Sequence, residues 1–159
     1  MTGANFDNDL KYSEVQAERL DRYFEANGWN VNKVSLSTDK RGIDRTMTKG
    51  DQSITVEYKS DRSPSTNAFV ELFSVGDMWS QKGWVWTCQA EWFVYHKNAT
   101  DTVYLSRTED IREAVHRWAN SNRFNVRSTW NDAGYFTFGL CIPLPVYGCH
   151  AKTKTKLEG

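Results

Sequence analysis

Several features that mark common classes of protein are missing from this sequence. No apolar run approaches the length of a membrane span, and no segment has the apolar stretch of a secretory signal peptide. A glycine-rich phosphate loop is also missing, as is any Ser-His-Asp or Cys-His arrangement typical of covalent hydrolases. We therefore expect no membrane partner, a cytoplasmic location and no covalent enzyme intermediate.

An excess of positive charge and a paired set of cysteines are missing as well. The 20 basic and 20 acidic residues give a formal net charge of zero, whereas a protein that binds nucleic acid mainly by counterion release is usually basic. The three cysteines are an odd number, which suits a reducing compartment. The charge is less even locally, because seven basic residues lie between Lys33 and Arg62 against five acidic ones.

The composition suits one globular domain. The 159 residues are 39% hydrophobic and 14% aromatic, which is enough for a substantial core. We expect a flexible N-terminus at 1–12, a single domain at 13–150 and a flexible basic tail at 151–159. Hydrophobic periodicity predicts an α/β protein with a central sheet flanked by helices. The expected elements are helices at 13–27 and 106–120, strands at 30–36, 67–75 and 102–106, and a hairpin at 124–140.

A β-hairpin is also predicted over residues 42–59. Two β-rich runs flank Gly50-Asp51, and glycine at the first central position suits a two-residue II′ turn. Lys49 then pairs with Gln52, so that Asp44 lies opposite Glu57. Alternation gives one apolar face, which only Arg45 interrupts. Its members are Ile43, Met47, Ile54, Val56 and Tyr58.

The other face of this hairpin carries Asp44, Glu57 and Lys59. Directly opposed carboxylates destabilise a sheet, and a bound divalent cation would reverse that repulsion. Magnesium needs only one or two protein carboxylates, with water and substrate phosphate as its other ligands. The alternative is an exposed hairpin with scattered charges.

Asp44, the hairpin and Glu57-Tyr58-Lys59 together resemble the signature of the PD-(D/E)xK nuclease superfamily, over roughly residues 13–96. Ile43 stands where the proline of the family's name would be. The resemblance implies a mixed sheet with a restriction-endonuclease-like αβββαβ core, to which residues 124–140 add a C-terminal hairpin extension. It also implies a magnesium- or manganese-dependent endonuclease, a hydrolase that cuts DNA with a metal-activated water and leaves 5′-phosphate and 3′-hydroxyl ends.

The resemblance implies roles for particular residues. Asp44 and Glu57 would bind metal, and Lys59 would position or help activate the attacking water. Glu18 would join them, because resolvase-like members carry a first-helix glutamate about three turns before the glycine that ends the helix; the alternative is a solvated acidic face. Arg41, Arg45, Arg62 and Lys82 are candidate substrate contacts, and Glu71, Glu14 and Gln89 are second-tier site residues.

Several questions about function stay open from sequence. A similarity of segments 69–72, 83–87 and 89–95 to small phage-encoded members favours a viral origin, and with it a location in the host-cell cytoplasm. The chief alternative to an enzyme is a non-cleaving module of the same shape that binds nucleic acid or protein, and a third interpretation is an RNA nuclease. Branched and single-stranded DNA both remain candidate substrates, and a homodimer remains open. For Trp84, Trp86 and Trp92, base stacking and core packing are both possible roles.

Overall fold

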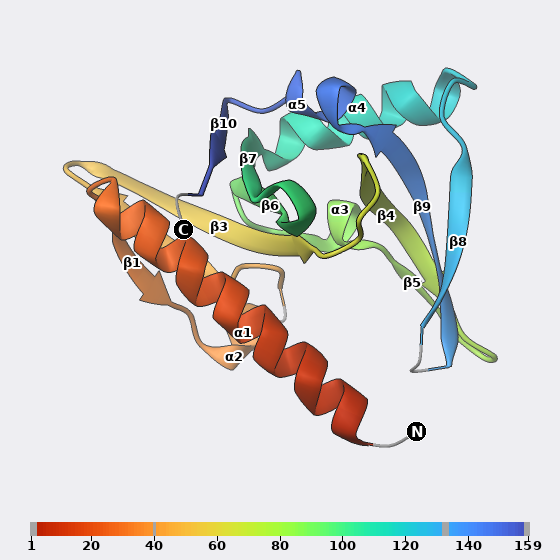
Figure 1. The fold of residues 1–159 in the computed structure, drawn as a ribbon, viewed down its shortest axis with the longest axis horizontal. Helices are drawn as coiled ribbons and strands as arrows, with labels where there is room; N and C mark the ends of the chain where they lie inside the picture. The colour runs from red at the N-terminus through yellow and green to blue at the C-terminus, as the bar shows by residue number, and fades with distance from the viewer. Residues whose placement is uncertain (1–2, 40, 132–133, 158–159) are drawn as a thin grey trace.

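The structure is a computed structural model that describes residues 3–39, 41–131 and 134–157, with side chains from residue 11 onward. Its strands form two sheets (Figure 1). The larger sheet is mixed and has the order β1 (Asn30–Lys33), β2 (Arg45–Lys49), β3 (Gln52–Asp61), β6 (Trp92–Lys97), β7 (Thr102–Arg107) and β10 (Thr153–Lys156). The smaller sheet is antiparallel and has the order β5 (Ser80–Lys82), β4 (Asn67–Val75), β9 (Tyr135–Pro143) and β8 (Val126–Asn131).

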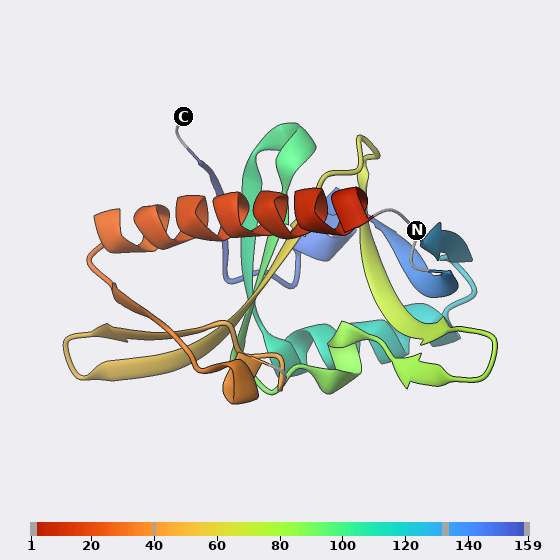
Figure 2. The same cartoon turned by 90° about the horizontal axis from the view of Figure 1, so that it is seen from below.

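Helices cover both faces of the larger sheet, which confirms the predicted α/β class. Helix α1 (Gly3–Ala26) lies on one side, and α3 (Trp84–Thr87) and α4 (Thr108–Asn120) lie on the other, as Figure 2 shows. The remaining helical segments are short: α2 (Leu36–Asp39), the 3-10 turn η1 (Asn98–Thr100) and α5 (Leu144–Gly148). No helix in the described part of the chain is both long and apolar enough to span a bilayer.

The end of α1 is where the sequence predicts it, but its start is not. Gly28 adopts a φ of 85°, and the Trp29 N–H donates to the Phe24 carbonyl at 3.0 Å, which is a Schellman-type ending. The helix begins at Gly3 rather than at Ser13. Residues 3–12, expected to be a flexible N-terminus, therefore extend the helix.

The hairpin formed by β2 and β3 has the predicted register. Lys49 pairs with Gln52, and the ladder continues to Arg45 opposite Val56. Met47, Val56 and Tyr58 are buried against apolar residues of α1, as alternation requires. Ile43 was wrongly placed on this face. It precedes the ladder and joins the core on the other side of the sheet.

Arg45 interrupts that apolar face because it has a partner on α1. Its guanidinium donates to both carboxylate oxygens of Asp21, at 2.9 and 3.1 Å through Nε, and the Tyr58 hydroxyl donates to the same carboxylate at 3.0 Å. The Arg45 and Asp21 side chains are only 10% and 16% exposed. The pair therefore joins helix and hairpin through a largely buried charged contact.

The second sheet corrects two expectations about topology. Strand β4 has the predicted bounds, but it pairs with β5 and β9 instead of joining the central sheet. The C-terminal hairpin is thus part of a sheet rather than an extension. The expected flexible tail includes β10, which pairs with β7.

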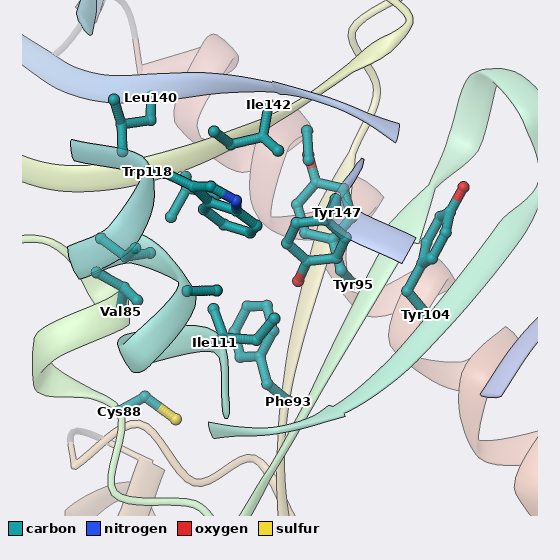
Figure 3. Close-up of a cluster of buried hydrophobic side chains, with 14 of the residues drawn as sticks. Val85, Cys88, Phe93, Tyr95, Tyr104, Ile111, Trp118, Leu140, Ile142 and Tyr147 are labelled. Carbon is teal, nitrogen blue, oxygen red and sulfur yellow. The ribbon is translucent and has the colours of Figure 1, made fainter. Parts of the chain in front are cut away.

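The main core fills the space between the two sheets and α4. Phe93 and Tyr95 from β6, Leu140 and Ile142 from β9, and Trp118 from α4 converge there, as Figure 3 shows. The N-cap position of α4 is Arg107, whose side chain makes no capping hydrogen bond. This core fixes the second sheet against β6, and so beside β3.

We predict that Asp21→Ala destabilises the protein by about 3 to 5 kcal/mol, because the Arg45 guanidinium would be left buried without its carboxylate. Urea unfolding measures this change. The control is Glu113→Ala, which removes an exposed ion pair with Arg117 of 3.5 Å and should change stability by less than about 1 kcal/mol. Equal effects of the two variants would contradict this account of Arg45.

Candidate active site

Asp44 and Glu57 meet at the open end of the β2–β3 ladder. Asp44 immediately precedes β2, and its N–H donates to the Val56 carbonyl at 2.9 Å, one residue out of the register in which Arg45 is the partner of Val56. Glu57 follows Val56, so both carboxyl groups point to the sheet face opposite α1. The two acids lie close enough to interact, although the paired ladder ends at Arg45 and Val56 and does not include them as register partners.

The contacts of each carboxyl group differ. Asp44 Oδ2 accepts the Tyr58 N–H at 2.7 Å, which ties the loop before β2 to β3. Glu57 is 6% exposed, and its Oε1 lies 3.2 Å from the Lys59 ammonium. Glu57 Oε2 is buried and has no hydrogen-bond partner among the residues that the structure describes. One carboxylate oxygen is therefore left with unused capacity to bind a ligand.

Burial raises the pKa of both acids, and the charge of Glu57 raises that of Asp44 further. Desolvation, followed by the charge of Glu57, raises the pKa of Asp44 to about 7. Desolvation also raises the pKa of Glu57, and this outweighs the lowering by Lys59. A hydrogen bond from Asp44 acts to lower the pKa of Glu57, as expected for two carboxyl groups that share a proton.

Lys59 remains an ammonium in this environment. Desolvation acts to lower its pKa, but the charge of Glu57 and the hydrogen bond to it more than offset that effect, and the pKa is raised. Its side chain is still 40% exposed. Lys59 is therefore placed as a hydrogen-bond donor facing solvent, and not as a neutral base.

Two further acids lie around this pair. Asp39, at the end of α2, is a hydrogen-bond acceptor for Asp44 that raises the pKa of Asp44, and its charge raises the pKa of Glu57. Glu71 on β4 is close enough for its charge to raise the pKa of Lys59. Sequence reasoning identified Glu71 but missed Asp39. The only sign of Asp39 in the sequence is that an acidic residue lies five positions before Asp44. The sequence does not reveal the path of the chain between the two.

The loop that carries Asp39 and Asp44 is held by the segment after α3. Gln89 N–H donates to the Arg41 carbonyl at 3.0 Å, and Ala90 N–H donates to the Gly42 carbonyl at 3.3 Å. Gly42 has a φ of 70°, and a Cβ there would lie 2.8 Å from Cys88 Cα. Gln89 thus contributes its backbone to the site, while its side chain is exposed.

Glu18 and Glu14 are not brought to this pair. Both side chains are exposed on α1, and α1 packs through Leu20 and Phe24 on the face opposite Glu57. No hydrogen bond or ion pair connects either acid to Asp44 or Glu57 in the described part of the chain. The expected three-carboxylate set is therefore replaced by a pair with Asp39 beside it.

The four candidate substrate contacts do not lie together around Asp44 and Glu57. Arg45 is bound to Asp21 on the α1 face, and Lys82 pairs in register with Phe73 on the face of the second sheet that points away from Glu71. Arg41 is exposed on the loop before Asp44, where its guanidinium donates to Thr38 at 3.1 Å. Arg62 is exposed just beyond β3, with its guanidinium 5.3 Å from the Tyr12 ring centroid.

The tryptophans considered for base stacking are engaged inside the fold. Trp84 lies in α3 and stacks on Phe93 with a centroid distance of 4.1 Å. The Trp86 ring lies 5.1 Å from His116, and the Arg107 guanidinium lies 5.3 Å from the Trp92 ring. Packing against neighbours accounts for all three.

The site offers a divalent metal ion few protein ligands. No group of three or more His, Cys, Asp or Glu side chains is placed to hold a metal within residues 3–39, 41–131 and 134–157. Asp44 and Glu57 form a pair, and Glu57 Oε2 is the orphaned buried oxygen. The donors are therefore compatible with a hard cation that takes most of its ligands from water and substrate, and not with a cage made by the protein.

Comparison of the chain with models of protein families, with curated proteins and with solved structures finds no match. The chemistry of this site is therefore inferred from its own geometry.

We predict that Asp44→Asn stabilises the protein at pH 8. The ordinary pKa of 3.8 rises to about 7 on folding, so the folded chain holds a proton that the unfolded chain releases between these values. This group thus lowers stability as pH rises from about 4 to 7, by up to about 1.4 kcal/mol per pH unit. The asparagine keeps an acceptor for the Tyr58 N–H and removes the charge.

Urea unfolding of both proteins between pH 4 and pH 8 measures the effect. The stabilities should converge toward pH 4 and separate toward pH 8. If the wild-type protein instead becomes more stable relative to Asp44→Asn as pH rises, Asp44 is not protonated in the folded state.

Proposed function

We propose that this chain is a metal-dependent nuclease of the PD-(D/E)xK type that hydrolyses phosphodiester bonds in DNA. One observation carries the proposal: the half-buried carboxyl group of Asp44 and the buried carboxyl group of Glu57 meet at the end of the β2–β3 hairpin, with the Lys59 ammonium 3.2 Å from Glu57. A protein with only a structural use for this face has no reason to keep two acids together, because burial and the charge of Glu57 raise the cost of ionising Asp44.

The order of elements supports the proposal. Helix α1 is followed by the antiparallel strands β1, β2 and β3, and β3 then pairs in parallel with β6. A restriction-endonuclease-like core predicts a helix followed by three strands and a later parallel strand. The segment between β3 and β6 differs from that plan, because it contributes β4, β5 and only one helical turn at α3.

A magnesium or manganese ion would be held by Asp44 and Glu57. When bound, it would supply Lewis acidity and positive charge for a phosphodiester that is under attack by water. The ion would also lower the pKa of both acids, since opposite charge favours the ionised form. Metal affinity should therefore rise as pH approaches 7.

The residues of the chain have separate tasks in this proposal. Lys59, as an ammonium, donates a hydrogen bond to the attacking water or to a phosphate oxygen and so orients it. Asp39 helps to hold Asp44 in place. Arg41, exposed on the loop before Asp44, is suited to contact a flanking phosphate. The products would carry 5′-phosphate and 3′-hydroxyl ends.

A second candidate function is a non-cleaving module of the same shape. Two observations favour it: the formal net charge is zero, and no three-ligand metal group is present in the residues that the structure describes. The raised pKa values of Asp44 and Glu57 count against it, since a binding surface gains nothing from acids held near one another.

Cleavage of DNA tests the proposal most simply. Wild-type protein should cut plasmid or single-stranded DNA in millimolar Mg²⁺ or Mn²⁺ and not in EDTA. Asp44→Ala and Glu57→Ala should abolish cleavage, and Lys59→Ala should lower the rate by about a hundredfold or more, as expected for loss of a positioned donor. Thermal melting checks that each variant is folded.

Glu18→Ala is the matched control, because it removes a carboxylate from the other side of the sheet. It should cut DNA at the wild-type rate. Cleavage of RNA alone would favour an RNA nuclease, and tight binding without cleavage of either would favour the non-cleaving module. Activity that survives Glu57→Ala would overturn the proposed site.

A further inference from the structure

Part of the second sheet extends beyond α4. There, one face of the sheet carries mainly aromatic side chains and the other carries mainly polar ones. One face, here called the aromatic face, consists of Phe73, Lys82, Trp130, Phe136 and Phe138. The other, here called the polar face, consists of Glu71, Ser74, Trp79, Asn131, Tyr135 and Thr137. Register pairing assigns the faces: Ser74 lies opposite Thr137, while Phe73 lies opposite Phe138.

A row of hydrogen bonds crosses the polar face. Asn131 Nδ2 donates to Thr137 Oγ1 at 2.9 Å, and Thr137 and Ser74 share a hydrogen bond of 3.1 Å. Ser74 Oγ in turn donates to Glu71 Oε1 at 3.3 Å. The row of hydrogen bonds therefore runs from the edge strand β8 across β9 to Glu71 on β4, whose charge interacts with that of Lys59.

Trp79 lies on this polar face at the end away from the candidate active site. Its indole covers Gly76, where a Cβ would lie 2.4 Å from Trp79 Nε1, and its ring centroid lies 5.2 Å from that of Tyr135. The side chain is still 46% exposed. The ring is thus supported from beneath and has a surface open to solvent, which is the arrangement that a stacking platform needs.

The polar face is continuous with the candidate active site. Glu71 interacts electrostatically with Lys59. On the same strand, Phe69 N–H donates to the Tyr95 hydroxyl at 3.1 Å, and Tyr95 is the register partner of Lys59. A polymer lying across the polar face would therefore approach Lys59 and Glu57 from the side of β4.

We propose that the polar face binds a single strand of nucleic acid, with one base stacked on Trp79 and the strand directed toward Lys59. This inference rests on the proposed function for the identity of the polymer. Ser74 and Thr137 are buried, but the partly exposed Asn131 amide and Tyr135 hydroxyl suit the edges of unpaired bases, and Arg127 on the exposed strand β8 offers a cation for a phosphate. A duplex keeps its bases stacked on each other and leaves none to lie on the indole.

The aromatic face supplies the matched control. Trp130 is 60% exposed, and its ring lies 4.8 Å from that of Phe136, so it is as accessible as Trp79. It lies on the opposite side of the same sheet and is not joined to the row of hydrogen bonds. Loss of Trp130 removes an exposed tryptophan without altering the polar face.

Two variants of different kinds act on the platform. Trp79→Ala removes the ring. Gly76→Ala keeps the ring and displaces it, because the added methyl would occupy the position of the indole. Trp79→Phe should restore part of the binding, since a smaller ring still stacks.

Fluorescence anisotropy of labelled oligothymidylate, measured in EDTA so that nothing is cut, tests the inference. Wild-type protein should bind the single strand more tightly than a blunt duplex of equal length. Trp79→Ala should weaken binding by about 5- to 150-fold, which corresponds to the loss of one stacked base. Gly76→Ala should also weaken it, and Trp130→Ala should stay within about twofold of wild type.

Equal losses in Trp79→Ala and Trp130→Ala, or no loss in either, would overturn the inference, as would tighter binding of the duplex. These outcomes are separable from the fate of the proposed function. Cleavage of duplex DNA without any effect of Trp79→Ala would keep the nuclease and remove the platform. Single-strand binding through Trp79 without cleavage would keep the platform and remove the nuclease.

Discussion

The repulsion between the carboxyl groups of Asp44 and Glu57 is the constraint on which this account depends. Both acids point to one face of the larger sheet, both are largely removed from water, and their pKa values are raised. The fold accepts this cost because other contacts hold the two strands together. The Tyr58 N–H binds Asp44, and Lys59 lies beside Glu57. Removal of either acid should relieve the repulsion, so the pair persists at the expense of stability.

The surrounding structure is arranged so that this pair cannot separate. On the sheet face that α1 covers, the Arg45 and Tyr58 side chains both donate hydrogen bonds to Asp21. These bonds join α1 to the strands that carry the acids. On the opposite face, which carries Glu57, backbone hydrogen bonds from Gln89 and Ala90 hold the loop that leads to Asp44. The second sheet then places Glu71 near Lys59. The charged groups of the site are thus positioned by four separate segments of the chain.

Sequence predicted the parts of the fold that local chemistry decides. The register of the hairpin follows from the turn at Gly50-Asp51 and from alternation, and the end of α1 follows from Gly28, so both predictions are confirmed. Glu18 was misjudged because a periodic stripe shows which residues share a helix face but not which face of the sheet the helix covers. Asp39 was missed beside the two acids because the path of the chain between it and Asp44 is not visible in the sequence.

The same limit explains the errors in topology. Strand β4 has the alternation of any half-buried strand, and only the later strand β9, far away in sequence, decides that it belongs to a second sheet. The tail reads as basic and polar, yet Leu157 is buried and its N–H donates to the Asp101 carbonyl at 2.9 Å, next to β10. Long-range pairing of this kind leaves little trace in a short window of residues.

The central claim is that the opposed carboxyl groups form a place for a divalent cation. Titration calorimetry of Mn²⁺ into the wild-type protein at pH 6 and at pH 8, in buffers of different ionisation enthalpy, tests it most directly. We expect one binding event that is tighter at pH 8, that releases protons at pH 6, and that disappears in Asp44→Ala. Binding of equal strength to the wild type and to a folded Asp44→Ala variant, or no binding to either, would contradict the account.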